Sequence, residues 1–156
     1  MSKSLKRVVA ALEAAGIDSV PLEMGSETRT AQQAADAAGC LVDQIAKSII
    51  FRGEASGEAI LFVTAGNNQV CADKASDLAG EALGKADAAL IRAQTGFAIG
   101  GVAPLGHLNP MRAFLDPHLF DFPQIWAAAG TPRHIFAISP EDLERVSGAY
   151  PADFTV

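Results

Sequence analysis

A glycine-rich loop in the second half of the chain has the composition of a site that acts through its backbone. Residues 95–107 hold four glycines, a proline and a histidine among apolar residues. The pair Gly100 and Gly101 lets the backbone approach a ligand closely or reach positive φ, and Pro104 fixes the direction in which the chain leaves. Such a loop can direct main-chain N–H groups at a carbonyl or phosphate oxygen. A tight bend between two strands is the alternative that these residues leave open.

One lysine and two histidines are the side chains that could most readily take part in catalysis or ligand binding. Lys47 stands at the start of an apolar stretch, where a lysine either extends into solvent or contacts a phosphate or a ribose hydroxyl. His107 and His134 each follow a glycine motif, and neither has a serine, cysteine or aspartate nearby in the order of a catalytic triad. A structural, hydrogen-bonded histidine remains the alternative for both.

Other reactive or aromatic residues give weaker indications. Cys40 and Cys71 have no C-x-x-C or metal-ligand spacing, which argues against a zinc site or a disulfide framework. Trp126 is expected in the core, whereas Phe97 could stack on a nucleic-acid base because it lies beside the glycine loop. We expect no metal and no cofactor.

Composition and charge limit the partners. The 156 residues are 49% hydrophobic and 19% charged, which is typical of one folded domain spanning residues 1–156. The net charge of −6 disfavours DNA and anionic membranes, but residues 88–115 contain no acidic side chain, so this region could contact one end of a nucleic acid. The first residues lack the apolar block of a signal peptide and no stretch resembles a membrane span, so we expect a cytoplasmic protein.

Helix signals occur at both ends of the chain and between the strands. Apolar spacing predicts a helix from about residue 5, capped by Ser4 and ending at Gly16. A capping-box pattern at Thr30 opens a second helix that stops at Gly39, and Asp73 is expected to cap a third that reaches about residue 83. The pair Ser139-Pro140 predicts a last helix, and the tail after residue 148 is expected to be loosely ordered. A helical turn is predicted at residues 42–46, and either a helical turn or a strand at residues 88–92.

Strand signals cluster in the middle of the chain. Residues 48–52 and 59–65 are expected to form a hairpin. Further strands are expected at residues 18–22, 69–72, 97–102, 112–115, 124–128 and 134–138. Because strands and helices do not alternate strictly, the order predicts a mixed α/β fold with a curved, largely antiparallel sheet and peripheral helices. The glycine loop does not fit the G-x-G-x-x-G fingerprint of dinucleotide-binding folds.

Three motifs in this order carry a family resemblance. They are residues 45–51 around Lys47, the Gly100-x-x-x-Pro104 motif, and residues 129–143 with the Ala-Gly-Thr-Pro and Ser-Pro-Glu-Asp-Leu sequences. Together they resemble the YbaK/prolyl-tRNA-synthetase-associated editing domain family, over nearly the whole chain. The resemblance implies hydrolysis, in trans, of the ester that joins a wrong amino acid to tRNA. A prolyl site cannot strongly exclude small amino acids, since one methylene contributes only about 1–3 kcal/mol to discrimination.

The resemblance also implies roles for individual residues. The main-chain N–H groups of Gly100 and Gly101 would hold the ester carbonyl, and Lys47 would contact the terminal phosphate or adenosine. Water, or the terminal ribose hydroxyl, would attack without a metal or a protein nucleophile.

Substrate contacts are expected from two further segments. The loop from Phe97 to Pro104 suggests a pocket for a small aliphatic side chain. Gly130 and Thr131 would line the amino-acid pocket, and His134 would join them unless it is simply a strand residue.

The expected substrate is tRNA(Pro) that carries cysteine, alanine or a similar small amino acid. Only the single-stranded acceptor end would be bound, because the chain is acidic, and prolyl-tRNA synthetase or an elongation factor would assist delivery. A non-catalytic module that binds an aminoacyl ester or nucleotide, or an interaction domain that docks on a synthetase, are the alternatives.

Overall fold

Two β-sheets form the centre of the fold. A computed structural model describes residues 1–156. The strands are β1 (Leu22–Glu23), β2 (Ala46–Gly53), β3 (Ala59–Ala65), β4 (Leu83–Lys85), β5 (Ala113–Leu115), β6 (Ile125–Ala128), β7 (His134–Ile138) and β8 (Tyr150–Pro151). The helices are α1 (Lys3–Ala14), α2 (Ala31–Ala38), α3 (Ala72–Ala79), α4 (Ala88–Thr95) and α5 (Pro140–Ser147), with 3₁₀ helices η1 (Val42–Gln44) and η2 (Pro117–Asp121). None of the helices combines the length and the hydropathy needed to cross a membrane.

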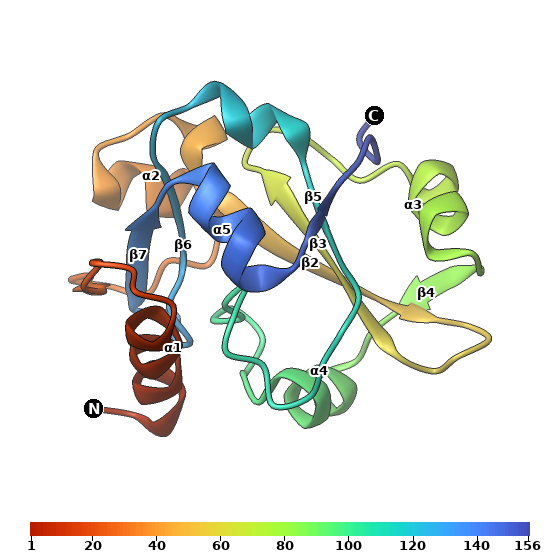
Figure 1. The fold of residues 1–156 in the computed structure, drawn as a ribbon, viewed down its shortest axis with the longest axis horizontal. Coiled ribbons are helices and arrows are strands. Elements are labelled where there is room, and N and C mark those ends of the chain that lie inside the picture. The colour runs from red at the N-terminus through yellow and green to blue at the C-terminus, as the bar shows by residue number, and fades with distance from the viewer.

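The sheets are mixed and largely antiparallel, as the order of elements predicts. One sheet has the strand order β1-β7-β6 and the other β4-β2-β3-β5-β8. Only the β3–β5 and β5–β8 pairs are parallel. A bridge between Ile45 and Trp126 links the two sheets. Figure 1 shows the three-stranded sheet with α1 and α2 at one end of the molecule and α3 with β4 at the other, joined by the long β2–β3 hairpin.

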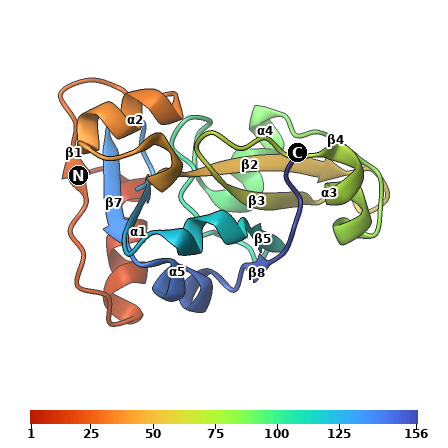
Figure 2. The same ribbon diagram turned by 90° about the horizontal axis from the view of Figure 1, so that it is seen from above.

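The β2–β3 hairpin organises the core. Its register runs from Ala46 opposite Ala65 to Arg52 opposite Ala59, which confirms the predicted hairpin. Every residue of β3 is buried, because both faces of this central strand are covered. Alternate side chains therefore join two cores: Leu61 and Val63 pack in the larger one with α1, and Phe62 packs in a smaller one with α3. Seen from above, β5, α5 and β8 lie on one side of the hairpin and α4 with β4 on the other (Figure 2).

Local capping signals are confirmed at two helices. The Thr30 hydroxyl accepts a hydrogen bond from the Gln33 amide and the Gln33 side chain returns one, so the capping box opens α2, which ends at Gly39 with φ of 71°. At α5, the Ser139 hydroxyl accepts from the Asp142 amide, and Pro140 takes the first helical position. Each cap satisfies an amide that the helix itself leaves without a partner.

Other local predictions are wrong in detail. Ser2, not Ser4, caps α1, since its hydroxyl accepts from the Leu5 amide at 3.1 Å. Cys71 is the N-cap of α3 without a side-chain hydrogen bond, so Asp73 is not the cap. This helix stops at Ala79, and residues 83–85 form a strand instead.

Long-range contacts account for the remaining corrections. Residues 69–72 are not a strand, and only a bridge from Val70 to Thr155 remains there. The C-terminal tail is ordered rather than loose, because β8 pairs with β5 and Phe154 is fully buried against Phe62. Residues 18–22 give only the short β1, and residues 88–92 belong to helix α4.

Residues 97–102 form a loop rather than a strand. The guanidinium group of Arg7, on α1, donates to the carbonyls of Gly96 and Gly106, each at 2.9 Å, and stacks 4.7 Å above the Phe97 ring. His107 Nε2 donates to the Ala103 carbonyl at 2.7 Å, because a carbonyl oxygen can only accept. Because one arginine and one histidine satisfy these carbonyls, the segment keeps its shape without a neighbouring strand.

Candidate active site

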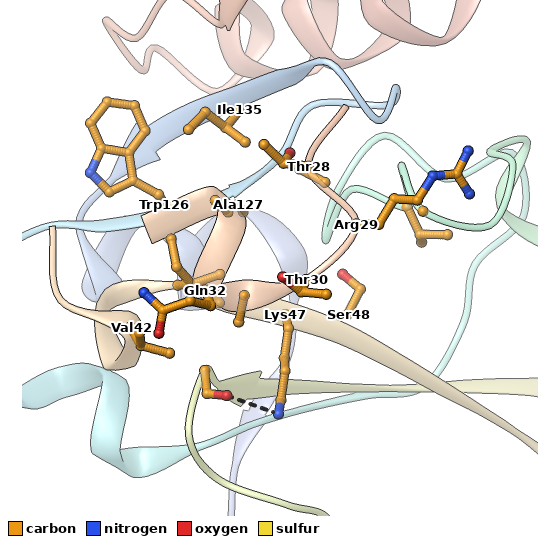
Figure 3. A pocket seen from close by; sticks show the side chains of 18 of the residues that line it. Thr28, Arg29, Thr30, Gln32, Val42, Lys47, Ser48, Trp126, Ala127 and Ile135 are labelled. Carbon is orange, nitrogen blue, oxygen red and sulfur yellow. Dashed lines mark hydrogen bonds between the residues drawn. The ribbon is translucent and has the colours of Figure 1, made fainter. Parts of the chain in front are cut away.

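A cavity of about 540 Å³ opens where the two sheets meet. It is lined by residues of β2 and β6, by α2 and the segment before it, by the turn after β3 and by the glycine loop. Its volume falls within the range of about 300–1,000 Å³ usual for small-molecule sites. Most of its wall is apolar; Figure 3 shows Trp126 and Ile135 on one side, with Lys47 and Ser48 on β2.

Lys47 lies in this cavity on β2, where the sequence places it at the start of the strand. Its ammonium donates to the Gly66 carbonyl at 3.1 Å, the bond drawn in Figure 3. Partial burial lowers the pKa of Lys47, and the nearby carboxylates of Asp116 and Asp43 oppose this shift. An ammonium has three N–H donors, so one bond to Gly66 leaves two for an anionic or hydroxyl ligand.

The glycine loop lines the same cavity with Ile99, Gly100 and Val102. None of these three main-chain N–H groups donates a hydrogen bond within the protein. The Gly101 amide, in contrast, donates to the Ala98 carbonyl at 3.1 Å, which closes a turn. The loop residues that line the cavity with free amides are therefore Ile99, Gly100 and Val102, whereas the expectation from sequence paired Gly100 with Gly101.

The turn between β6 and β7 packs directly against the glycine loop. A Cβ atom at Gly101 would lie 2.7 Å from the Thr131 Cα atom, so only glycine allows this close approach. The Thr131 hydroxyl is hydrogen-bonded to His134 Nδ1 at 2.6 Å and also accepts from the Arg133 amide at 3.1 Å. Thr131 and His134 thus lie next to the loop but do not line the cavity.

Three other residues expected to bind substrate are buried away from the cavity wall. Phe97 is fully buried in the larger core, where Arg7 covers its ring, so it offers no face to a base. Pro104 is buried as well, and Gly130 lies against the Ser4 carbonyl with φ of +95°. These residues shape the loop and its support, and none of them lines the cavity.

His107 is also a structural residue. Desolvation is the largest cause that lowers its pKa, and the positive charge of Arg7 acts in the same direction, while the bond to the Ala103 carbonyl opposes both. A neutral imidazole that holds the loop follows from this environment. The position of His107 therefore fits the alternative of a structural, hydrogen-bonded histidine.

Most of the cavity wall was not foreseen from the sequence. Ser48, Asn67, Trp126 and Ile135 line it, and Trp126, which was expected in the core, is half-buried. The lining contains hydroxyl groups but no histidine, cysteine, aspartate or glutamate. A serine without an adjacent base is a weak nucleophile, so the wall offers binding groups rather than a general base.

A polar cluster outside the cavity wall was also not expected from the sequence. It consists of Asp43, Asp116 and His118, which come from η1, the residue before η2 and η2 itself. No spacing in the sequence brings residue 43 together with residues 116 and 118, because only the tertiary fold does so. This cluster contacts the turn that accepts the Lys47 hydrogen bond.

Comparison with known proteins decides the family. The model of the aminoacyl-tRNA editing domain matches residues 25–146. The chain belongs to the aminoacyl-tRNA editing domain family. The resemblance expected from the three motifs is thereby confirmed, and the matched region contains every residue of the cavity wall.

Similar proteins support this membership of the editing domain family. The "Uncharacterized protein YwhH" of Bacillus subtilis (strain 168) is 31% identical over 125 residues, which cover 80% of this chain and 79% of that protein. A crystal structure of "a putative trans-editing enzyme for prolyl tRNA synthetase" is 44% identical, covers 100% of this chain and 99% of that one, and superposes with a TM-score of 0.92. The "hypothetical protein APE2540" is 26% identical, over 96% of this chain and 99% of that chain, with a TM-score of 0.87.

Proposed function

We propose that this editing domain is a trans-editing deacylase, which hydrolyses the ester bond of mischarged tRNA(Pro) carrying a small amino acid such as alanine or cysteine. One observation carries the proposal. Lys47, Gly100 and Val102 line one largely apolar cavity, the amides of Gly100 and Val102 have no partner within the protein, and the lining holds no histidine, cysteine or carboxylate. Family membership and the similarity to a structure described as an editing enzyme for prolyl-tRNA synthetase support the same reaction.

The free amides supply the electrostatic part of the reaction. In ester hydrolysis the oxygen of water attacks the carbonyl carbon and the carbonyl oxygen becomes an oxyanion. Attack by the terminal ribose hydroxyl would first move the acyl group to that oxygen, and water would then cleave the new ester. The Gly100 and Val102 amides donate to that oxygen, and because they are fixed in the loop they need no reorganisation during the reaction. The bond from the carbonyl carbon to the tRNA oxygen then breaks, and this oxygen takes up a proton. After attack by water, the products are free amino acid and uncharged tRNA.

Lys47 anchors the RNA end. Its two remaining N–H groups bind the terminal phosphate or a ribose hydroxyl, which holds the ester beside the loop. Arg29 lies on the same cavity wall and adds positive charge, although Glu27 pairs with it at 2.6 Å. Few phosphates are contacted in this arrangement, so the salt dependence of turnover is expected to be shallow.

The cavity wall favours a small amino acid. Ala34, Ala127 and Ala128 contribute short side chains to the apolar part of the wall, which Ile99, Trp126 and Ile135 complete. Against this part of the wall a bulky side chain would clash, and a charged side chain would lose its hydration without compensation.

A deacylation assay tests the proposal. Wild-type protein is incubated with tRNA(Pro) charged with alanine, cysteine, serine or proline, and the charged fraction is followed over time. We expect hydrolysis of at least one small mischarged amino acid, slow or no loss of proline, and a rate at least tenfold lower in Lys47→Ala. Binding without hydrolysis of any of these substrates would contradict the proposal and favour a non-catalytic module.

A further inference from the structure

The turn that receives the Lys47 ammonium is held by a carboxylate outside the cavity. This turn, residues 65–68, follows β3 and carries the Gly66 carbonyl. Asp116 is only 2% exposed, and its Oδ2 accepts from the Ala65 amide at 3.1 Å and from the Asn68 side-chain amide at 2.9 Å. The buried carboxylate of Asp116 therefore accepts hydrogen bonds from both ends of the turn.

A second carboxylate holds the middle of the turn. Asp43 Oδ1 accepts from the Asn67 amide at 2.9 Å, and its Oδ2 lies 3.1 Å from His118 Nε2. The His118 main-chain amide donates to Asp116 Oδ1 at 3.0 Å, so this residue connects the two carboxylates. Asp121 contacts the other ring nitrogen of His118 at 2.8 Å but does not contact the turn.

Close packing leaves the turn little freedom to move. A Cβ atom at Gly66 would overlap the carbonyl oxygen of Val42, the residue before Asp43 in η1. The turn and η1 are thus in direct contact at the position where the Lys47 bond is accepted. A lysine side chain has four rotatable methylene bonds, so a fixed acceptor is needed to keep its ammonium in one place.

We propose that Asp43 and Asp116 are positioning residues for Lys47, which fix the place and the charge of its ammonium by holding the 65–68 turn. The importance of this for catalysis rests on the proposed role of Lys47 in binding the RNA end. Neither carboxylate lines the cavity, so both act through the turn rather than on the substrate.

Electrostatics supports the same assignment. Burial lowers the pKa of Lys47, and the two carboxylates are the groups that raise it again. The other charged group on the cavity wall is Arg29, and His118 is the titratable group that touches Asp43. Loss of either carboxylate charge should therefore let the ammonium lose its proton at a lower pH.

The test compares two aspartate variants that share the contact with His118. Asp43→Asn keeps an oxygen to accept from the Asn67 amide but removes the charge, whereas Asp121→Asn removes a charge that does not reach the turn. The first readout is the pH titration of the Lys47 side chain by NMR in the free protein. We expect a lower titration midpoint in Asp43→Asn than in wild type and an unchanged midpoint in Asp121→Asn. Equal midpoints in wild type and Asp43→Asn, or an equal shift in both variants, would overturn the proposal.

Kinetics gives the second readout on mischarged tRNA. Since Lys47 holds the RNA end in the ground state and in the transition state alike, we expect KM to rise about tenfold in Asp43→Asn with kcat nearly unchanged. A fall in kcat with unchanged KM would contradict a role in positioning this ammonium. If the wild type hydrolyses no substrate, the proposed function fails, and the NMR midpoints still decide the positioning role. Asp116→Asn places an amide against two donors in a buried site, so Asp43→Asn is the variant expected to fold.

Discussion

Replacement of Gly101 by alanine should push the glycine loop away from the β6–β7 turn, which it contacts at Thr131. A Cβ atom at this position would lie 2.7, 2.8 and 2.9 Å from the Cα, carbonyl carbon and amide nitrogen of Thr131. Ordinary Cβ contacts begin at 3.4 Å, so the two backbones must move apart by about 0.7 Å. Neither side of this contact is a flexible side chain, and the strain cannot relax by a rotamer change.

The size of the effect follows from this displacement. Overpacking a well-packed interior costs about 1–3 kcal/mol of unfolding free energy. For a chain of this length, that corresponds to a Tm lower by about 2–12 °C. The loop carries the Gly100 and Val102 amides, and a misplacement of about 1 Å in a catalytic group can reduce the rate about a hundredfold. We therefore expect kcat for deacylation to fall by about 10–100-fold.

Thermal unfolding and single-turnover deacylation measure the two effects. Gly25→Ala is the matched control, since a Cβ atom there meets nothing within 4 Å and its φ is not in the left-handed region. Its Tm should stay the same or rise slightly, because alanine reduces the entropy of the unfolded chain. A Gly101→Ala protein with the Tm and kcat of this control would refute the close approach and the role of the loop.

Two further predictions concern stability away from the cavity. Arg7→Met removes the donors to the Gly96 and Gly106 carbonyls, which should cost about 2–4 kcal/mol and lower Tm by about 5–15 °C in a thermal melt; an unchanged Tm would show that Arg7 does not hold the loop. Hydrogen bonds to Ser56 and Arg112 lower the pKa of Glu81 from 4.5 to about 2. Because the folded pKa is the lower one, the stabilisation is present above pH 4.5 and is lost as the pH falls through about 2. Glu81→Gln should therefore flatten the decline of Tm between pH 5 and pH 2, and parallel curves for both proteins would contradict this.

Elements whose signals are local could be predicted from the sequence. The capping box at Thr30 and the Ser139-Pro140 start of α5 depend on residues within one helical turn, and the β2–β3 hairpin depends on two neighbouring apolar runs. Elements set by distant partners could not. The tail is ordered because Phe154 fills a core formed with Phe62, and no residue near position 154 indicates this.

The candidate site was predictable to a similar degree. Lys47 and Gly100 were expected to act together, and the structure places both on one cavity wall. Phe97 was expected to bind substrate but is fully buried in the larger core, where Arg7 of α1 covers its ring. Asp43 and Asp116 lie 73 positions apart in the sequence, so their shared turn became visible only in the fold.

The catalytic role of the loop amides is tested most directly by NMR of these amides with a bound substrate analogue. An adenosine whose 3′ oxygen is replaced by nitrogen and acylated with alanine presents the same carbonyl but cannot be hydrolysed as an ester. On its addition, we expect the amide protons of Gly100 and Val102 to shift downfield in NMR spectra, together with a change at the Lys47 side chain, while the Gly101 amide keeps its bond to Ala98. Saturating analogue that perturbs Lys47 but leaves the Gly100 and Val102 amides unchanged would contradict the claim that the backbone of this loop polarises the ester.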